Sequence, residues 1–316
     1  MNNQIKLVSV VGPTASGKTG LSVELAKHFH GEIISADSMQ IYQGMTIATA
    51  KPDKAEQQGI AHHLMDFLPP DSTYSVAMFV EDAKRCIREI TYRGNLPFIV
   101  GGTGLYVDSL LNNIQFSDDQ RDEALSEQLW AEYEQNGLEP LLEQLASFDS
   151  DSAQRLAPER NPKRVIRAIE FYLTTGITIT EQNRRSRTQQ SPYYAVKIGL
   201  NFSDREKLYD RINRRVDLML EQGLIEEAKT VLSSSLSFTS VKAIGYKELA
   251  PYIRGEASLD DCVEKLKRET RRYAKRQLTW FRRDKDIHWL YVDNYDSFEE
   301  LYNAAVNMIN KGLAYG

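Results

Sequence analysis

The sequence predicts an α/β protein with a parallel sheet at its core, helices flanking that sheet, and a helical insertion domain. Three observations predict this fold. Strand patterns alternate with helical patterns along residues 5–111, a glycine-rich loop follows the first strand, and residues 120–187 show little strand character. The length of 316 residues suits one large domain or a core with an insert.

Short apolar runs and helical spacing alternate in the first third of the chain. Runs that are typical of buried strands occupy residues 5–11, 32–36 and 96–100. Helical spacing follows the first run, with Leu21, Leu25, Ala26 and Phe29 on one face, and recurs at residues 76–92 and 105–111. Strands that are separated by helices favour parallel pairing, because the helix carries the chain back across the sheet.

The pattern changes in the middle of the chain. Residues 120–187 have helical periodicity, with breaks at Asn136-Gly137, Pro158, Pro162 and Thr175-Gly176. Strand character returns at residues 194–200, and helical spacing then continues to an apolar patch at residues 288–292. We therefore expect a core made of residues 1–113 and 193–316, the latter with C-terminal helices, and a helical insertion domain at residues 114–192.

Composition is that of a soluble protein. Apolar residues make up 41% of the chain and charged residues 26%, which is ordinary for a protein with a sizeable core. The two cysteines, Cys86 and Cys262, form no CxxC pair, so neither a disulfide framework nor a cysteine-rich zinc site is expected. No apolar run reaches the length of about 18 residues that spans a bilayer. We expect a cytoplasmic protein with no membrane partner.

Charge is segregated along the chain, although the net charge is only −5. Residues 117–151 carry eleven acidic residues and one basic residue. Residues 160–187 carry seven basic and two acidic residues, and residues 264–285 carry ten basic and three acidic residues. Such segregation can create a positive face on an acidic protein.

Residues 12–19 match the phosphate-loop pattern G-x-x-x-x-G-K-T, and they lie between a strand and a helix as this motif requires. The glycines let the backbone wrap around an anion, and the helix adds a positive N-terminal field. Lys18 places a charge on a terminal phosphate, and the Thr19 hydroxyl suits Mg²⁺. The predicted diphosphate-binding residues are Gly12, Pro13, Thr14, Ala15, Ser16, Gly17, Lys18 and Thr19. The core is expected to resemble the P-loop NTPase fold.

The loop indicates a polyphosphate without specifying which one. Enzymes that hydrolyse nucleoside triphosphates usually carry an Asp at the end of a buried strand to hold Mg²⁺. Here the strand at residues 96–100 ends in Gly101-Gly102-Thr103, which weakens that interpretation. Asp37 ends another strand and could hold the metal instead.

Further motifs follow the phosphate loop. They are residues 35–45 (SADSMQIYQGM), 49–52 (TAKP), 62–66 (HHLMD), 101–106 (GGTGLY), 161–165 (NPKRV), 211–216 (RINRRV), 243–248 (AIGYKE) and 275–282 (KRQLTWFR). Together with the phosphate loop they resemble the tRNA isopentenyltransferase (dimethylallyltransferase) family. Because the motifs run in order from residue 8 to about residue 290, the resemblance covers nearly the whole chain.

The resemblance implies an enzyme that transfers a dimethylallyl group from dimethylallyl diphosphate to the N6 amine of adenine 37, in tRNAs that read codons beginning with U. It implies Mg²⁺ as the cofactor, Asp37 as the general base, Thr103 as a contact of the donor, and Arg215 as a neighbour of the diphosphate. Position alone leaves other roles open. Asp37 could be a metal ligand or a helix cap, Thr103 a turn or cap residue, and Arg215 or Arg214 a solvated salt-bridge residue.

The resemblance also implies that three stretches contact the anticodon stem-loop of tRNA. They are Asp37, Ser38, Met39 and Gln40; Lys163, Arg164, Val165, Ile166 and Arg167; and Lys242, Ala243, Ile244, Gly245, Tyr246 and Lys247. Lys163, Arg164 and Arg167 share one face of a helical pattern, which suits phosphates, although a solvated basic face has the same pattern. We expect the insertion domain to help grip the stem-loop, and we expect a monomer.

Residues 259–283 predict a long helix with two stripes. Leu259, Leu266, Tyr273 and Trp280 recur every seven residues, so we expect them to face the core. Arg268, Arg272 and Arg276 recur every four residues and predict a basic ridge that could meet phosphates.

Two positions depart from the family pattern Asp-Ile-Gly-Thr-Ala-Lys-Pro, because Thr46 replaces the Asp and Ala48 replaces the Gly. Three alternative functions remain open. A small-molecule adenylate isopentenyltransferase would share the phosphate loop and Asp37 but would not need a large insert or two basic stretches. The others are a kinase that uses ATP and a P-loop protein that only binds RNA.

Overall fold

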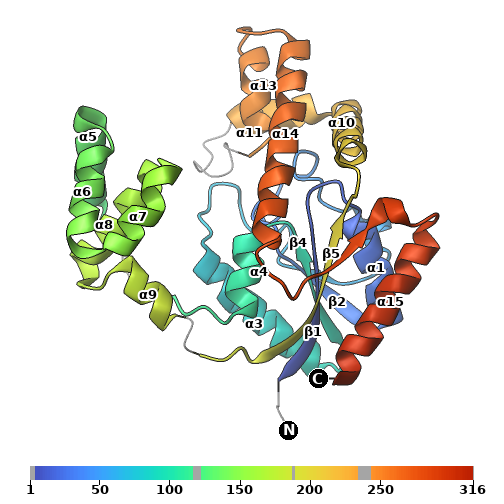
Figure 1. Ribbon diagram of the computed structural model, residues 1–316. Coiled ribbons are helices and arrows are strands. Elements are labelled where there is room, and N and C mark those ends of the chain that lie inside the picture. The colour runs from blue at the N-terminus through green and yellow to red at the C-terminus, as the bar shows by residue number, and fades with distance from the viewer. Residues whose placement is uncertain (1–3, 117–121, 187–188, 234–242, 316) are drawn as a thin grey trace. The chain divides into compact units, whose positions relative to one another are not determined.

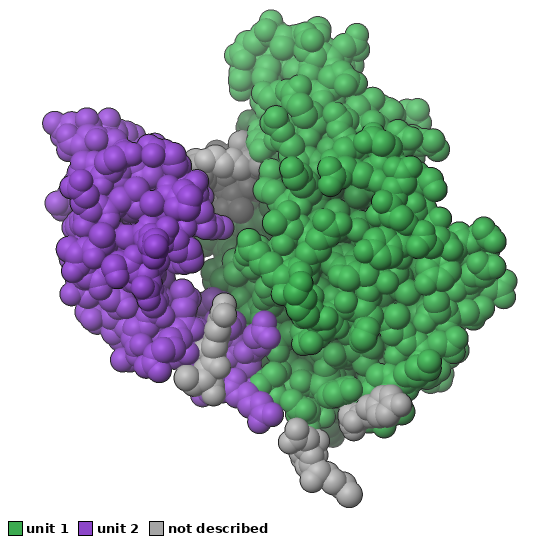
Figure 2. All heavy atoms as spheres, viewed as in Figure 1, with its two compact units in different colours: residues 1–111, 191–316 green, residues 112–190 purple. Residues whose placement is uncertain are grey.

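The chain is described by a computed structural model that covers residues 4–116, 122–186, 189–233 and 243–315. It divides into two compact units, residues 1–111 with 191–316 and residues 112–190, which are green and purple in Figure 2. The helical insertion was expected at residues 114–192. Its described elements are all helical.

The first unit is built on a parallel sheet, as predicted. Its six strands lie in the order β3-β2-β4-β1-β5-β6, and every neighbouring pair is parallel. The strands are β1 (Ile5–Val11), β2 (Gly31–Ser35), β3 (His62–His63), β4 (Leu96–Gly101), β5 (Tyr193–Asn201) and β6 (His288–Tyr291). The predicted strand segments are thus confirmed, and the two-residue β3 is an addition that the sequence pattern did not indicate.

Helices cover both faces of the sheet (Figure 1). On one face lie α1 (Lys18–His28) and α15 (Phe298–Tyr315), and on the other lie α3 (Val76–Tyr92) and α4 (Gly104–Leu111). Side chains alternate along β1, so Leu7 and Val11 pack in the cluster formed with α3 and α4. Val8 and Val10 pack in the cluster formed with α1 and α15. The continuous apolar run of β1 follows from this burial on both sides.

A group of C-terminal helices completes the first unit. They are α10 (Arg205–Glu221), α11 (Leu224–Ser233), α13 (Tyr246–Ile253) and α14 (Leu259–Phe281), and the short elements α2 (Lys54–Gln57) and η2 (Val292–Asn294) also belong to this unit. These helices share an apolar cluster with the chain that follows β2, in which Tyr42, Met45, Val216, Tyr246 and Leu266 are buried. The loop after β2 is thereby tied to helices that lie more than 150 residues further along the chain.

The second unit has its own core. It contains α5 (Glu123–Asn136), α6 (Glu139–Phe148), α7 (Ser150–Leu156), η1 (Ala157–Glu159), α8 (Pro162–Thr175) and α9 (Ile179–Arg185). Leu141, Leu145, Val165 and Ile169 are buried at its centre. No helix in the described ranges of either unit is both long enough and apolar enough to cross a membrane.

Candidate active site

The phosphate loop joins β1 to α1 and has the backbone geometry of an anion cradle. Ala15 and Gly17 adopt positive φ angles of 62° and 91°. A Cβ atom at Gly12 would lie 2.4 Å from the carbonyl oxygen of Leu200, so only glycine fits at this close approach to β5. The loop ends at the N-terminus of α1, where unpaired amide groups and the helix dipole favour an anion. The predicted strand, loop and helix are confirmed.

Three loops meet at the carboxyl edge of the sheet, because the strands that precede them are parallel and β4 lies between β1 and β2. The phosphate loop follows β1, Asp37 follows β2, and Gly102 follows β4. They border a pocket of about 370 Å³. Its polar lining residues are Thr14, Lys18, Thr19, Asp37, Ser38, Gln40, Thr49, Arg215, Lys247, Thr270, Tyr273, Arg276 and Gln277.

The remaining walls of the pocket are apolar. They are formed largely by Met39, Ala48, Ala50, Ile212, Val216, Met219, Leu224, Ala243, Ile244 and Leu266, which come from the loop after β2, from α10, α11 and α14, and from the segment before α13. A pocket lined by both charged and apolar side chains suits a ligand that has an anionic part and an apolar part.

Charged groups gather around Lys18. Its ammonium donates a hydrogen bond of 2.7 Å to the carbonyl oxygen of Pro13. Burial and then the neighbouring Arg215 guanidinium lower the pKa of Lys18 to about 7, whereas Asp37 opposes this shift. Burial likewise lowers the pKa of Arg215, with Asp37 again opposing. Of the two candidate arginines, Arg215 lines the pocket and Arg214 is exposed outside it.

Asp37 has one oxygen engaged with the backbone. Its Oδ1 accepts hydrogen bonds from the amides of Met39, at 2.9 Å, and Gln40, at 3.3 Å. Within the described part of the chain, no hydrogen bond reaches Oδ2. Residues 38–41 form a turn and not a helix, so these bonds close a turn and do not cap a helix. They leave one oxygen of a pocket-lining carboxylate available for chemistry.

Thr103 supports the loop after β2. Its hydroxyl accepts a hydrogen bond of 3.0 Å from the Ser38 amide, and its own amide donates to the carbonyl of Ala36 at 3.1 Å. Thr103 is not one of the described residues that line the pocket. The structure thus places its side chain beside Ser38, and the predicted contact with the donor stays a prediction.

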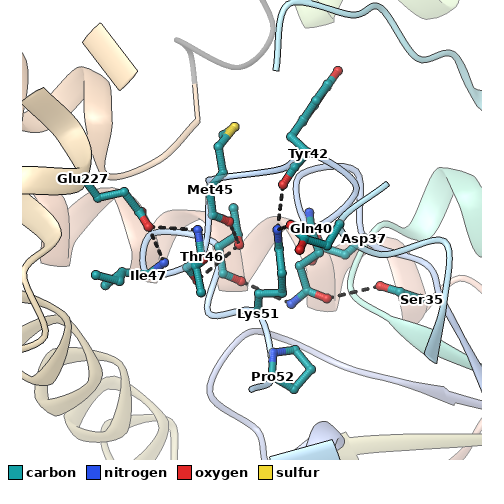
Figure 3. A network of polar contacts seen from close by, with 12 residues as sticks. Ser35, Asp37, Gln40, Tyr42, Met45, Thr46, Ile47, Lys51, Pro52 and Glu227 are labelled. Atoms are coloured by element: carbon teal, nitrogen blue, oxygen red, sulfur yellow. Dashed lines mark hydrogen bonds and ion pairs between the residues drawn. The ribbon is translucent and has the colours of Figure 1, made fainter. Parts of the chain in front are cut away.

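Gln40 is also tied to its surroundings. Its Nε2 donates to the carbonyl oxygens of Thr49 and Ala50, at 3.2 and 3.3 Å, and its Oε1 accepts from the Ser35 hydroxyl at 3.1 Å (Figure 3). These bonds hold the loop after β2 in a compact form. Asp37, Ser38, Met39 and Gln40 all line the pocket, as a role in binding the acceptor requires.

Two pocket residues on α14 were not singled out by the sequence analysis. Tyr273 was expected in the core and instead lines the pocket beside Thr103 and Gln277. Gln277 is buried, accepts from the Thr14 amide at 2.8 Å, and donates to the Gly102 carbonyl at 3.0 Å. It therefore joins the phosphate loop to the loop after β4. The sequence signal was the spacing of residues 266, 270, 273 and 277, which is one helical face of mixed polarity.

The three arginines of the predicted basic ridge on α14 have different surroundings. Arg276 lines the pocket, Arg268 is exposed on the surface, and Arg272 is paired with Glu269 at 2.6 Å. Of the expected core stripe on the same helix, Leu266 is fully buried, while Leu259 and Trp280 are partly buried against apolar clusters.

The predicted RNA-contact segment before α13 divides into pocket residues and one core residue. Ala243, Ile244, Gly245 and Lys247 line the pocket, and Lys242 lies outside the described residues. The side chain of Tyr246 is fully buried, and its hydroxyl donates to Glu227 at 2.9 Å. The ring packs in the core beneath this segment, and the predicted RNA contact of Tyr246 stays a prediction.

The basic segment of α8 belongs to the second unit and is not part of the pocket. Lys163 and Arg164 are exposed, and Arg167 is half-exposed and lies 3.7 Å from Glu170. Val165 and Ile166 are buried in the core of the unit, so their side chains do not face solvent, and the predicted RNA contact of this stretch stays a prediction. Helical periodicity explains the division, because residues adjacent in sequence point in different directions around the helix.

Thr19 and Asp37 fit a magnesium ion. Both line the pocket and both offer oxygen atoms, the ligand type that Mg²⁺ prefers. Among the described residues, no cluster of three or more His, Cys, Asp or Glu side chains could hold a metal alone. That arrangement suits an ion that takes one or two protein ligands and completes its shell with phosphate oxygens and water.

Comparison with known proteins gives matches over most of the chain. A family model described as IPP transferase matches residues 40–284, and one described as isopentenyl transferase matches residues 5–67. The tRNA dimethylallyltransferase of Acetivibrio thermocellus is 49% identical over 92% of this chain and 93% of that protein. The enzyme of the same name from Staphylococcus epidermidis is 46% identical over 96% of this chain and 92% of its own length.

Solved structures with the same fold cover the chain equally well. A tRNA isopentenylpyrophosphate transferase from Bacillus halodurans has 43% identity and a TM-score of 0.72, with 98% of both chains covered. A eukaryotic dimethylallyltransferase acting on tRNA has 28% identity and a TM-score of 0.83, over 98% of this chain and 80% of that one. The motifs, the sheet with its phosphate loop and these matches agree, and this chain belongs to the IPP transferase family.

Proposed function

We propose that the chain transfers a dimethylallyl group from dimethylallyl diphosphate to the N6 amine of adenine 37 in tRNAs that read codons beginning with U, and releases diphosphate. One observation carries this proposal. An anion cradle with Lys18 and Arg215 and a carboxylate with an available oxygen, Asp37, line the same pocket. Membership of the IPP transferase family supports the same reaction.

The donor is proposed to bind with its diphosphate on the phosphate loop. The backbone cradle, the Lys18 ammonium and the Arg215 guanidinium supply positive charge where the leaving group develops negative charge. The five-carbon tail is apolar, and the apolar walls of the pocket suit it. The same walls limit the access of water to the allylic carbon.

The acceptor step is proposed to use Asp37. The N6 lone pair of adenine forms a bond to the allylic carbon as the bond from that carbon to the diphosphate oxygen breaks. Diphosphate leaves with the electron pair of the broken bond. The proton from the amine passes to Asp37 Oδ2, while Oδ1 stays bonded to the amides of Met39 and Gln40 and keeps the carboxylate oriented.

Magnesium is proposed as the cofactor, with Thr19 as its protein ligand. When bound, the ion neutralises charge on the diphosphate and so makes it a better leaving group.

The RNA partner is proposed to be the anticodon stem-loop of tRNA. An adenine in a folded loop must be turned out of its stack before an enzyme can reach its amine, and a pocket-shaped site meets that need. Exposed Lys163 and Arg164 on the second unit and exposed Arg268 on α14 suit phosphate contacts. We also propose that the protein acts as a monomer on cytoplasmic tRNA.

The test is incubation of the protein with Mg²⁺ and radiolabelled dimethylallyl diphosphate, with either unmodified tRNA or AMP as acceptor. We expect label in tRNA and none in AMP. Label in AMP alone would identify a small-molecule adenylate isopentenyltransferase. Hydrolysis of ATP without prenyl transfer would identify a kinase-like activity, and tRNA binding without any transfer would identify an RNA-binding protein.

A further inference from the structure

The turn formed by residues 46–50, called here the 46–50 turn, points three consecutive amides at one side chain. The amides of Thr46 and Ile47 donate to Glu227 Oε2 at 2.8 and 2.7 Å, and the amide of Ala48 donates to Oε1 at 2.9 Å. The hydroxyl of Tyr246 also donates to Oε1, at 2.9 Å. Figure 3 shows Glu227 reaching this turn from outside the loop.

Only a carboxylate satisfies this arrangement. All four partners of Glu227 are donors, and an ionised glutamate has two acceptor oxygens with room for about four hydrogen bonds. A glutamine in its place would direct its NH₂ group at one set of donors. Successive amides that converge on one anion form a concave anion site, so the acidic side chain is the group that such a turn selects.

Glu227 holds two walls of the pocket together. Ala48, Thr49 and Ala50 line the pocket on one side, and residues 243–245 line it next to them. A Cβ atom at Gly245 would lie 3.1 Å from the Cβ of Ala48, so the two segments approach closely enough to crowd any side chain at position 245. Glu227 bonds the first segment directly and the second through Tyr246.

The inner side of the same turn is fixed independently. Gln40 donates to the carbonyls of Thr49 and Ala50, and the Lys51 ammonium donates to the carbonyl of Tyr42 at 2.6 Å and pairs with Asp66. Among the described residues, no hydrogen bond joins the 46–50 turn to Lys18, Thr19 or Arg215. Loss of Glu227 should therefore loosen the wall and leave the phosphate cradle intact.

We propose that Glu227 is a positioning residue for the acceptor nucleobase, because it fixes the pocket wall formed by the 46–50 turn and residues 243–245. This inference rests on the proposed function, which supplies the nucleobase. It also accounts for the departures at Thr46 and Ala48. The turn is held through backbone amides, so its anchoring by Glu227 does not depend on the side chains at these two positions.

The test compares Glu227→Gln with two matched controls. Glu226→Gln removes the same charge from the neighbouring, exposed position of α11. Thr46→Ala removes a side chain but keeps the amide that donates to Glu227. We expect Glu227→Gln to lower kcat/KM for tRNA by about tenfold, because its NH₂ group would face amide donors and loosen the wall that positions the base. Both controls should stay within twofold of the unaltered protein.

Two readouts separate this role from general damage. Binding of inorganic diphosphate, measured by calorimetry, should be unchanged in Glu227→Gln. Hydrogen exchange should be faster in Glu227→Gln at the amides of Thr46, Ile47 and Ala48, and unchanged in β1 and β4. Exchange does not depend on catalysis, so it tests the anchoring even where the unaltered protein transfers no prenyl group.

Two results would overturn the proposal. One is a Glu227→Gln variant with the same kcat/KM for tRNA as Glu226→Gln. The other is a Glu227→Gln variant that loses diphosphate binding in the same proportion as tRNA activity, because that would show a general effect on the fold.

Discussion

The phosphate loop and the 46–50 turn line the same pocket but are held in place in different ways. The phosphate loop is fixed by the fold of the sheet, since it joins adjacent elements, β1 and α1, and presses against β5 at Gly12. The 46–50 turn has little regular structure of its own. It is fixed by side chains from outside the turn, nearby Gln40 on one side and distant Glu227 on the other.

This difference separates the two substrates. The rigid, charged end suits a diphosphate, which is the same in every turnover and needs a constant cradle. The other end must admit a base that comes from a large folded RNA, and its walls depend on a few replaceable hydrogen bonds. Changes at the two ends should therefore affect donor binding and acceptor use separately.

The largest effect is expected from the substitution Asp37→Asn, because Asp37 is the proposed general base. The asparagine keeps an oxygen for the amides of Met39 and Gln40 but cannot take the proton from the amine. We expect kcat to fall by about 10²–10⁴-fold, the usual contribution of a general base. Inorganic diphosphate should bind no more weakly than before. A fall in kcat of less than tenfold would show that Asp37 is not the base.

The second largest effect is expected in the pH dependence of donor binding at the phosphate loop. Lys18 has a pKa lowered to about 7 by burial and Arg215, and a bound diphosphate anion must raise that pKa again. The complex therefore holds more protons than the free protein above about pH 7. Affinity for dimethylallyl diphosphate should fall as pH rises beyond that value, by up to about tenfold per pH unit.

Calorimetric measurement of the affinity for dimethylallyl diphosphate between pH 7 and 9 checks this pH dependence, with Lys18→Met as the control. The control has no ammonium to titrate, so any pH dependence it keeps belongs to the ligand or to other groups. A parallel pH dependence in the two proteins would contradict the role given to Lys18.

A smaller effect is expected where the phosphate loop is braced by α14. In Gln277→Glu, a carboxylate oxygen would face the Gly102 carbonyl, which accepts from Gln277 Nε2 in the native protein. Diphosphate affinity should fall by about tenfold, and it should recover relative to the native protein as pH falls and the new acid becomes a donor. Gln277→Leu is the comparison, because it removes both bonds and should show no such recovery. Equal pH profiles for the two variants would rule out this bracing role.

The smallest effect is expected on helix α8 of the second unit. Lys163→Ala and Arg164→Ala should each weaken tRNA binding a few-fold and reduce the slope of log affinity against log salt by about one. Inorganic diphosphate binding should not change. Arg85→Ala, which removes an exposed, salt-bridged arginine from α3, is the matched control. An unchanged salt slope would mean that α8 does not meet the RNA backbone.

The helices and strands that depend on local sequence patterns could be predicted from the sequence. The run at residues 5–11 became a strand with the same limits, since an apolar run followed by a glycine loop has few other solutions. The helix at residues 76–92 matches its prediction for the same reason. The strand order and β3 depend on long-range pairing, which leaves no periodic signal.

The site was harder to predict where it depends on residues far apart in sequence. Lys18, Asp37 and Arg215 were identified by motif and do line one pocket. Glu227 and Gln277 were missed, because their partners lie about 180 and 263 positions earlier in the chain. Tyr246 and Val165 were named because they belong to contiguous motifs, but the fold directs their side chains into the core. A motif gives a stretch of chain, and only the helix or turn that contains it decides which side chains face outward.

The central claim is that the phosphate loop holds an allylic diphosphate while Asp37 deprotonates a nucleobase amine. Its most direct test is mass analysis of the nucleosides from tRNA that has been incubated with dimethylallyl diphosphate, Mg²⁺ and either the native protein or Asp37→Asn. We predict a dimethylallyl adenosine at position 37 with the native protein and only a trace with the variant. An unmodified adenosine with the native protein, or equal modification by both proteins, would contradict the claim.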